Sequence, residues 1–112
     1  MKTFTDERGT IEDLKVGKDW SVTYISFKKG AVRGNHYHKE TIQTDVILSG
    51  RLVHSNHIGD RIVKEGDIVV HTEHEPHAYM AIEASEMVSM CKGVRIGEDY
   101  SKDTYKLEKP LI

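Results

Sequence analysis

The chain has 112 residues, of which 38% are hydrophobic and 30% charged, and its formal net charge is −2 at pH 7. This length suits one hydrophobic core, so we expect a single domain over residues 1–112. The nearly balanced charge excludes the basic surface typical of nucleic-acid-binding proteins, and the apolar runs are too short to cross a bilayer. The first residues lack the apolar core of a signal peptide, so we expect a cytoplasmic protein without nucleic-acid or membrane partners.

Short β-prone segments alternate with turn residues along most of the chain, which is typical of an all-β sandwich or barrel. The predicted strands, in chain order, are Ser21–Lys28, Arg33–His38, Thr44–Ser49, Arg51–His54, Arg61–Lys64, Ile68–His71, His77–Ala81 and Glu86–Lys92. Glycine-containing turns such as Ser49-Gly50 separate them. We expect little helix, with one short helical turn at residues 11–15, and a polar tail at residues 93–112 that packs along the barrel or onto a partner subunit.

Histidine is the unusual residue of this sequence. All seven fall between positions 36 and 77: His36, His38, His54, His57, His71, His74 and His77. Residues two apart in a strand point to the same face, so the imidazoles of His36 and His38 project together. Such a pair is a natural metal chelate for Zn, Fe, Ni, Cu or Mn. The alternative is an exposed pair on the solvent face of an edge strand.

Further groups could complete a site around this pair. Gln43 follows five residues later and could offer its carbonyl oxygen as a third ligand, and Asp45 shares its face. A carboxylate inside a barrel needs a partner, which the histidines or a metal would provide. His77 begins a strand directly after Pro76 and is well placed to complete a metal site from the opposite sheet, with Tyr79 on the same face.

Three other side chains are candidates for contact with a ligand. His71 and His74 are expected at the mouth of the barrel, where either could reach a bound molecule. Arg33 lies on the strand of the histidine pair but out of phase with it, so a bulge at Gly34 would be needed to bring Arg33 to the pocket.

Residues 30–50 resemble the first sequence motif of the cupin superfamily, and residues 66–81 resemble the second motif more loosely. The residues in register are Gly30, His36, His38, Gly50, Gly66 and His77, and Gln43 stands where the family has glutamate. The resemblance implies an all-β, double-stranded β-helix (jelly-roll) barrel with its core at about residues 20–92. It also implies a divalent transition metal (Zn, Mn, Fe or Ni) held by His36, His38, Gln43 and His77. Because glutamine is neutral, the cation would be held less tightly, and a metal-free pocket with histidines as acid and base is the alternative.

A second resemblance concerns function. The segments Asp6-Glu7-Arg8-Gly9 and Arg33-Gly34-Asn35-His36 are similar to those of cupins that isomerise or epimerise nucleotide-linked keto-sugars. This implies an anion contact by Arg33 and a base at His36 or His38.

We therefore expect an isomerase or epimerase that acts on a carbonyl-containing, carbohydrate-like small molecule. The expected catalytic residues are His36, His38 and Tyr79, and the expected substrate contacts are Arg33, Asp45, His71 and His74. The alternatives are a metal-dependent dioxygenase and a non-catalytic small-molecule-binding protein. Small barrels with exposed sheet edges often pair, so we expect a homodimer.

Overall fold

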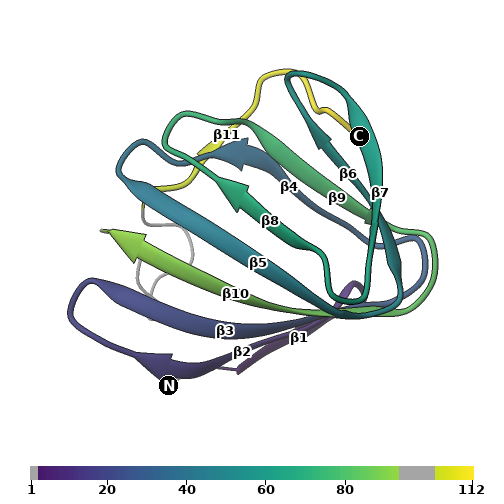
Figure 1. Ribbon diagram of the computed structural model, residues 1–112, viewed down its shortest axis with the longest axis horizontal. Helices are drawn as coiled ribbons and strands as arrows, with labels where there is room; N and C mark the ends of the chain where they lie inside the picture. The colour runs from purple at the N-terminus through teal and green to yellow at the C-terminus, as the bar shows by residue number, and fades with distance from the viewer. Residues whose placement is uncertain (1–2, 94–102) are drawn as a thin grey trace.

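The computed structural model describes residues 3–93 and 103–112, which form two antiparallel sheets packed face to face (Figure 1). The six-stranded sheet has the order β1 (Thr3–Asp6), β2 (Gly9–Val16), β3 (Trp20–Phe27), β10 (Ser85–Gly93), β5 (Thr41–Ser49) and β8 (Ile68–His71). The five-stranded sheet has the order β11 (Tyr105–Lys106), β4 (Val32–Tyr37), β9 (His77–Ala81), β6 (Arg51–Asn56) and β7 (Asp60–Lys64). The described residues include no helix that could span a membrane.

Alternation along the strands decides what lies between the sheets. In β5, Gln43, Asp45 and Ile47 are buried, whereas Ile42 and Leu48 on the opposite face are exposed. This period of two follows from the pleat of the strand, and it holds equally in β10. One face of each strand therefore builds the interior, and the other face forms the outer surface of the sheet.

The interior has an apolar part and a polar part. The apolar core is made of Phe27, Ala31, Ile47, Leu52, Val63, Val69, Tyr79, Ala81 and Met87. Burial of a large aliphatic side chain of this kind stabilises the fold by about 1.5–3 kcal/mol. Further along the same strand faces, inward positions change to polar residues, such as Gln43 in β5, Ser89 in β10 and His77 in β9. The apolar part holds the two sheets together, and the polar part provides side chains that can bind a ligand.

The predicted strands are all present, and Ile68–His71 and His77–Ala81 have the predicted bounds. The helical turn expected at residues 11–15 is wrong, because these residues belong to β2, which pairs with β3. The buried Asp13, which accepts a hydrogen bond from the hydroxyl of Thr23 at 3.2 Å, shows why: the neighbouring strand satisfies backbone and side chain together.

The described part of the C-terminal segment packs along the barrel, which is one of the two positions expected for the tail, the other being on a partner subunit. Tyr105 and Lys106 form β11 against β4, and the Leu107 amide donates to the carbonyl oxygen of Asn35 at 2.9 Å. The side-chain oxygen of Asn35 accepts the amide of Leu111 at 2.8 Å, which anchors the last residues. The rest of the predicted tail, residues 94–102, lies outside the described residues.

Candidate functional site

A cavity of about 390 Å³ opens between the two sheets at the polar part of the interior. Its wall is formed by Arg8, Ile11, Thr23, Ile25, Phe27, Arg33, Gly34, His36, Gln43, His77, Tyr79, Met87, Ser89 and Thr104. Apolar side chains such as Ile11, Ile25 and Met87 share this lining with imidazole, amide and guanidinium groups. A small cavity with few convergent polar groups is the usual form of a ligand site.

Three histidines meet beside this cavity, and two of them, His36 and His77, line it. His36 is in β4, His38 follows directly after it, and His77 begins β9, where it pairs in register with His36. One ring nitrogen from each histidine lies within 4.8 Å of those of the other two. His77 joins the His36–His38 pair as predicted, but the expectation that it does so from the opposite sheet is wrong, because β9 pairs with β4 in the same five-stranded sheet.

A bulge in β4 makes this meeting possible. The register of β4 against β9 shifts between Gly34 and His36, where Gly34 has φ +96° and Asn35 φ +59°. The extra residue resets the alternation, so that Arg33 and His36 both reach the cavity wall. The expectation that Arg33 needs a bulge at Gly34 to reach the pocket is confirmed. A Cβ atom at Gly34 would lie 2.8 Å from the carbonyl oxygen of His77, so only glycine fits.

Backbone carbonyl groups fix the orientation of two of the rings. His38 Nδ1 lies 2.8 Å from the carbonyl oxygen of Asp103, and His77 Nδ1 lies 3.2 Å from that of Glu75. Since a carbonyl oxygen only accepts, each Nδ1 carries a proton, and the Nε2 of a neutral ring then presents a lone pair. His77 Nε2 is buried and has no hydrogen-bond partner. Burial, reinforced by the neighbouring His71, holds the pKa of His77 well below its usual value, which keeps the ring neutral.

Gln43 brings an oxygen to the same point. Its Oε1 lies 3.1 Å from His38 Nε2, while its Nε2 donates to both carboxylate oxygens of Asp45 at 3.1 Å. The reverse orientation of the amide would set its oxygen against two carboxylate oxygens. The Gln43 oxygen and the ring nitrogens, including the unpartnered buried Nε2 of His77, form a donor set that fits a divalent cation. The residues that would hold it are His36, His38, Gln43 and His77.

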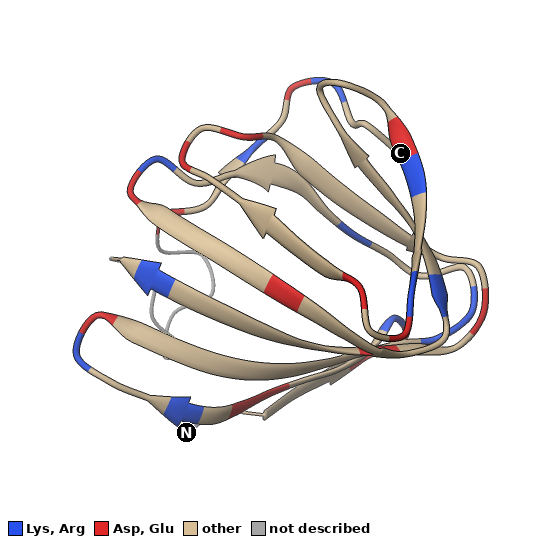
Figure 2. Cartoon of the chain, in the orientation of Figure 1, with Lys and Arg blue, Asp and Glu red and all other residues tan. Residues whose placement is uncertain are grey.

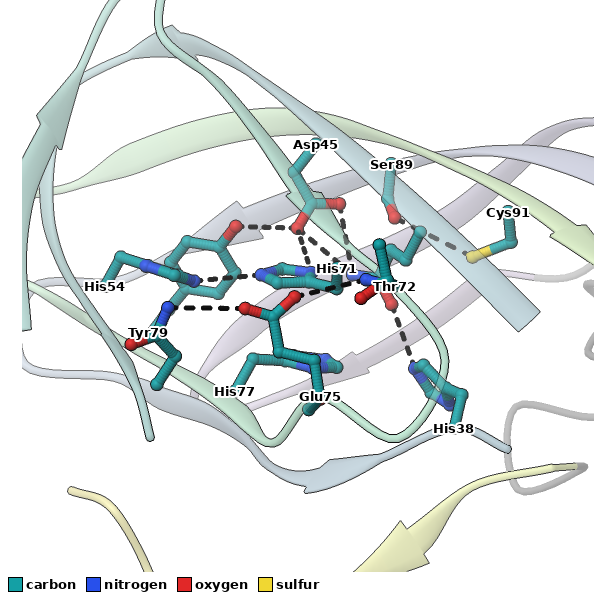
Figure 3. Close-up of polar contacts among 12 residues, drawn as sticks. His38, Asp45, His54, His71, Thr72, Glu75, His77, Tyr79, Ser89 and Cys91 are labelled. Atoms are coloured by element: carbon teal, nitrogen blue, oxygen red, sulfur yellow. Dashed lines mark hydrogen bonds and ion pairs between the residues drawn. The ribbon is translucent and has the colours of Figure 1, made fainter. Parts of the chain in front are cut away.

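A buried polar layer lies behind this wall (Figure 3). Tyr79 donates its hydroxyl proton to Asp45 at 2.7 Å, and the Nε2 atoms of His54 and His71 are 2.9 Å apart. The ring of His71 stacks on that of His77, with centroids 3.9 Å apart. Burial lowers the pKa of His71 to about 3, with help from His54, so its contact with Asp45 at 3.5 Å does not join two full charges.

Three of the expected substrate contacts do not reach the cavity. Asp45 points inward as the alternation predicts, whereas His71, expected at the mouth of the barrel, is fully buried in its interior. Neither lines the cavity, because other inward-facing side chains form its wall. His74 lies in a separate surface depression together with His57. Its loop enters β9 from outside the barrel, so His74 is not placed to contact a molecule bound beside His36.

Arg8 is the wall residue that the sequence prediction did not use. It comes from the turn between β1 and β2, where its guanidinium pairs with Asp6 at 2.6 Å. The Asp6-Glu7-Arg8-Gly9 segment is the sequence feature that could have indicated Arg8, but the sequence does not predict that this segment lies near Arg33. Arg33 itself is 7% exposed, and it donates from Nη2 to the carbonyl oxygen of Ser26 at 3.1 Å. Its Nε has no hydrogen-bond partner. The cavity thus has guanidinium groups as well as imidazoles in its wall.

No protein-family model matches the chain, and no curated protein matches it either. Solved structures do. The capsular polysaccharide assembling protein CapF from Staphylococcus aureus superposes on 96% of this chain with a TM-score of 0.76 and 19% identity. This chain spans only 34% of CapF. KdgF from Halomonas sp. superposes on 85% of this chain, which spans 90% of KdgF, with a TM-score of 0.75 and 19% identity.

A third similar structure is a sugar phosphate isomerase of the cupin superfamily from Silicibacter pomeroyi. It superposes on 69% of this chain, which spans 52% of it, with a TM-score of 0.64 and 17% identity. At these identities the likeness concerns the fold. The neighbours in structure are cupin-superfamily proteins, and the chain has the cupin fold, an all-β double-stranded β-helix.

Proposed function

We propose that this protein is a metal-dependent cupin isomerase or epimerase that acts on an anionic, carbonyl-containing sugar in the cavity. The observation that carries the proposal is the convergence of three imidazoles and the Gln43 oxygen beside a cavity whose lining also includes Arg8 and Arg33. Similar structures described as a sugar phosphate isomerase and as a capsular polysaccharide assembling protein support a carbohydrate substrate.

The two arginines select the charge of the substrate. Arg33 is a buried cation with an unpartnered Nε, and Arg8 lies on the same cavity wall. A buried charge without a counter-charge is costly, so a carboxylate or phosphate of the substrate would relieve it. The cavity of about 390 Å³ lies near the lower end of the range for small-molecule sites, roughly 300–1,000 Å³, which suits a monosaccharide.

The histidines have the role of ligands in this proposal. A ring nitrogen that gives its lone pair to a cation does not accept a proton, so His36 and His38 are not the base while a metal is bound. When bound, the metal polarises the carbonyl oxygen of the substrate. A set of three imidazoles and an amide differs from the two-histidine, one-carboxylate triad of many iron oxygenases, which favours the isomerase over the dioxygenase.

Tyr79 is the group that accepts the substrate proton. Its side chain lines the cavity, and its hydroxyl donates its own proton to Asp45 at 2.7 Å. Burial and the Asp45 charge raise the pKa of Tyr79 well above its usual value, so a free tyrosinate is unfavourable. The transfer is therefore concerted: Tyr79 Oη takes the proton next to the carbonyl as its own proton passes to Asp45. In the second half of the reaction Tyr79 gives a proton to the former carbonyl carbon and recovers its own from Asp45, while the neighbouring hydroxyl proton of the sugar passes to the former carbonyl oxygen.

The experiment is a survey of metal-loaded protein with hexose phosphates and hexuronates in D₂O, followed by NMR. We expect deuterium to enter the substrate next to its carbonyl. Whether the hexose phosphates or the hexuronates exchange shows whether the anion is a phosphate or a carboxylate. Tyr79→Phe should abolish the exchange while leaving the metal in place. Binding of the sugars without exchange would contradict the catalytic function and favour a binding protein.

A further inference from the structure

We propose that Asp45 is the positioning residue of the candidate metal centre: it holds Gln43 with its oxygen toward the cation and provides the negative charge that the ligands lack. This inference rests on the proposed metal site and adds to it a group that does not touch the metal. Gln43 and Asp45 are inward-facing neighbours two residues apart on β5, so the pleat of the strand alone sets them side by side.

The carboxylate of Asp45 is held rigidly. It has no exposed surface, and it accepts two hydrogen bonds from the Gln43 amide nitrogen at 3.1 Å and one from the Tyr79 hydroxyl at 2.7 Å. The two bonds from Gln43 are the ones that set the carboxylate against the amide. The same two bonds fix the amide, because a rotated amide would face two carboxylate oxygens with a third oxygen. Gln43 Oε1 is therefore set toward His38 Nε2 by Asp45.

Charge gives Asp45 its second role. Three neutral imidazoles and an amide bring no negative charge to a buried dication, which is an unfavourable environment for it. The Asp45 carboxylate stands one hydrogen bond behind the ligand oxygen. An N–H group that donates to a carboxylate polarises its amide and makes the carbonyl oxygen a stronger donor to a cation.

Asp45 also explains why position 43 suits glutamine. A glutamate at position 43 would place a second carboxylate about 3 Å from that of Asp45, and two such charges repel strongly in a buried site. Gln43 and Asp45 thus form one unit, with the oxygen ligand in front and the charge behind it.

The test compares metal affinities, measured with Zn²⁺ or Mn²⁺ in competition with a chromophoric chelator. We expect Asp45→Asn to weaken binding by about 10–100-fold, the usual effect of losing a partner of a metal ligand. Tyr79→Phe removes a different contact of the same carboxylate and is expected to bind like the wild type. The exchange Gln43→Glu with Asp45→Asn, which puts the charge in front and the amide behind, should recover at least most of the affinity.

The outcomes distinguish the role of Asp45 from the existence of the metal site. Wild-type affinity in Asp45→Asn would overturn the role of Asp45, and so would equal loss in Asp45→Asn and in the exchanged pair. Absence of metal binding by the wild type would overturn the metal site and this inference with it. Thermal unfolding of each variant shows whether it is folded. If Asp45→Asn does not fold, the metal affinity of the exchanged pair still tests the role of Asp45.

A separate observation concerns the outer face of the six-stranded sheet. The outward positions of β3, β10, β5 and β8 between its ends are almost all apolar: Trp20, Val22, Tyr24, Ile42, Thr44, Val46, Leu48, Ile68, Val70, Val88 and Met90. We call these residues the outer apolar face. They are contiguous, because Val88 lies between Tyr24 and Val46 in register and Val46 lies opposite Ile68. Ile68 is 60% exposed, and Figure 2 shows little charge along these strands.

We infer that a second copy of this chain covers the outer apolar face. At strand spacings of about 4.8 Å and rises of about 3.4 Å per residue, the face measures about 500 Å² in projection; with side-chain relief this approaches the roughly 600–800 Å² that one partner buries in a stable dimer. The charges at its ends are self-complementary. Glu86 and Lys92 lie near opposite ends of β10. A twofold axis perpendicular to the strands therefore brings Glu86 of each copy next to Lys92 of the other.

Sedimentation velocity tests this interface. We expect a dimeric wild type, a monomeric Ile68→Asp variant, and an unchanged dimer in Ile62→Asp, a matched control because Ile62 is 62% exposed on the other sheet. Lys92→Glu should weaken the dimer, and Glu86→Lys added to it should restore the pairing. A monomeric wild type, or a dimer that survives Ile68→Asp, would overturn the inference.

Discussion

His38 Nε2 and Gln43 Oε1 lie only 3.1 Å apart, within hydrogen-bond distance. Each atom is turned to this point by a partner behind it, the Asp103 carbonyl for the ring and the Asp45 carboxylate for the amide. Because the carbonyl oxygen requires a proton on Nδ1, Nε2 meets the amide oxygen either as the N–H group of an imidazolium or with a lone pair directed at a bound cation. Each of these states places positive charge beside the Gln43 oxygen, and the proposed metal centre is the second of them.

The bulge at Gly34 is expected to be essential for both fold and site. Gly34→Ala adds a Cβ atom 2.8 Å from the His77 carbonyl oxygen at a φ of +96°, which should lower the free energy of unfolding by at least about 2 kcal/mol. Gly30→Ala is the control, because Gly30 also has positive φ (+82°) but nothing within 4 Å of its Cβ position. Urea unfolding of both variants measures the difference, and equal stabilities would contradict the role of the close approach.

Arg33 is expected to lower the free energy of unfolding while it favours the binding of an anionic sugar. Arg33→Met removes a buried cation whose Nε is unpartnered, so the free energy of unfolding should stay the same or rise by about 1 kcal/mol. The same change should abolish most of the thermal stabilisation that a sugar phosphate or hexuronate gives to the wild type. Thermal melts with and without the sugar test both statements. A large loss of stability in Arg33→Met would mean that the guanidinium serves the fold.

Acid is expected to destabilise the chelator-treated protein from mildly acidic pH downward. Burial lowers the pKa of His54 and of His77, and lowers that of His71 to about 3 from the ordinary 6.5. Between these values the unfolded chain binds protons that the folded chain does not, so stability falls as pH falls below about 6.5. Each such histidine contributes a slope of roughly 1.4 kcal/mol per pH unit.

Urea unfolding between pH 7 and pH 5 measures this slope. His71→Gln should flatten it by about one histidine, because the variant has one fewer buried ring to protonate. A stability that is constant over this range would mean that these rings take up protons in the folded state as easily as in the unfolded chain.

The sequence predicts local features of this protein well. Alternation and glycine turns predict strands such as Ile68–His71, and the same period of two correctly turns Gln43, Asp45 and Tyr79 inward. The helical turn predicted at residues 11–15 is wrong because β2 pairs with β1 on one side and β3 on the other, and the residues of one segment alone do not record such pairing. The segment's short run of alternation is compatible with either structure.

The parts of the site that could not be predicted depend on packing. Asp45 faces the interior as expected, and His71 is buried there although it was expected at the mouth of the barrel. The positions of both behind the cavity wall follow from which side chains stand in front of them. Arg8 reaches the same cavity as Arg33 from the turn between β1 and β2, at the far edge of the six-stranded sheet. The His36, His38 and His77 group was predictable because its members lie at a strand end and a strand start, where spacing alone constrains them.

The metal content of the untagged protein is the most direct measurement of the proposed centre. Elemental analysis after purification and incubation with Mn, Fe, Ni and Zn should find about one equivalent of a divalent metal per chain in the wild type. His77→Ala should lose it, because the unpartnered Nε2 is removed, whereas His57→Ala, which changes a histidine of the outer depression, should keep it. A wild type without metal, or a His77→Ala variant with a full equivalent, would contradict the metal centre.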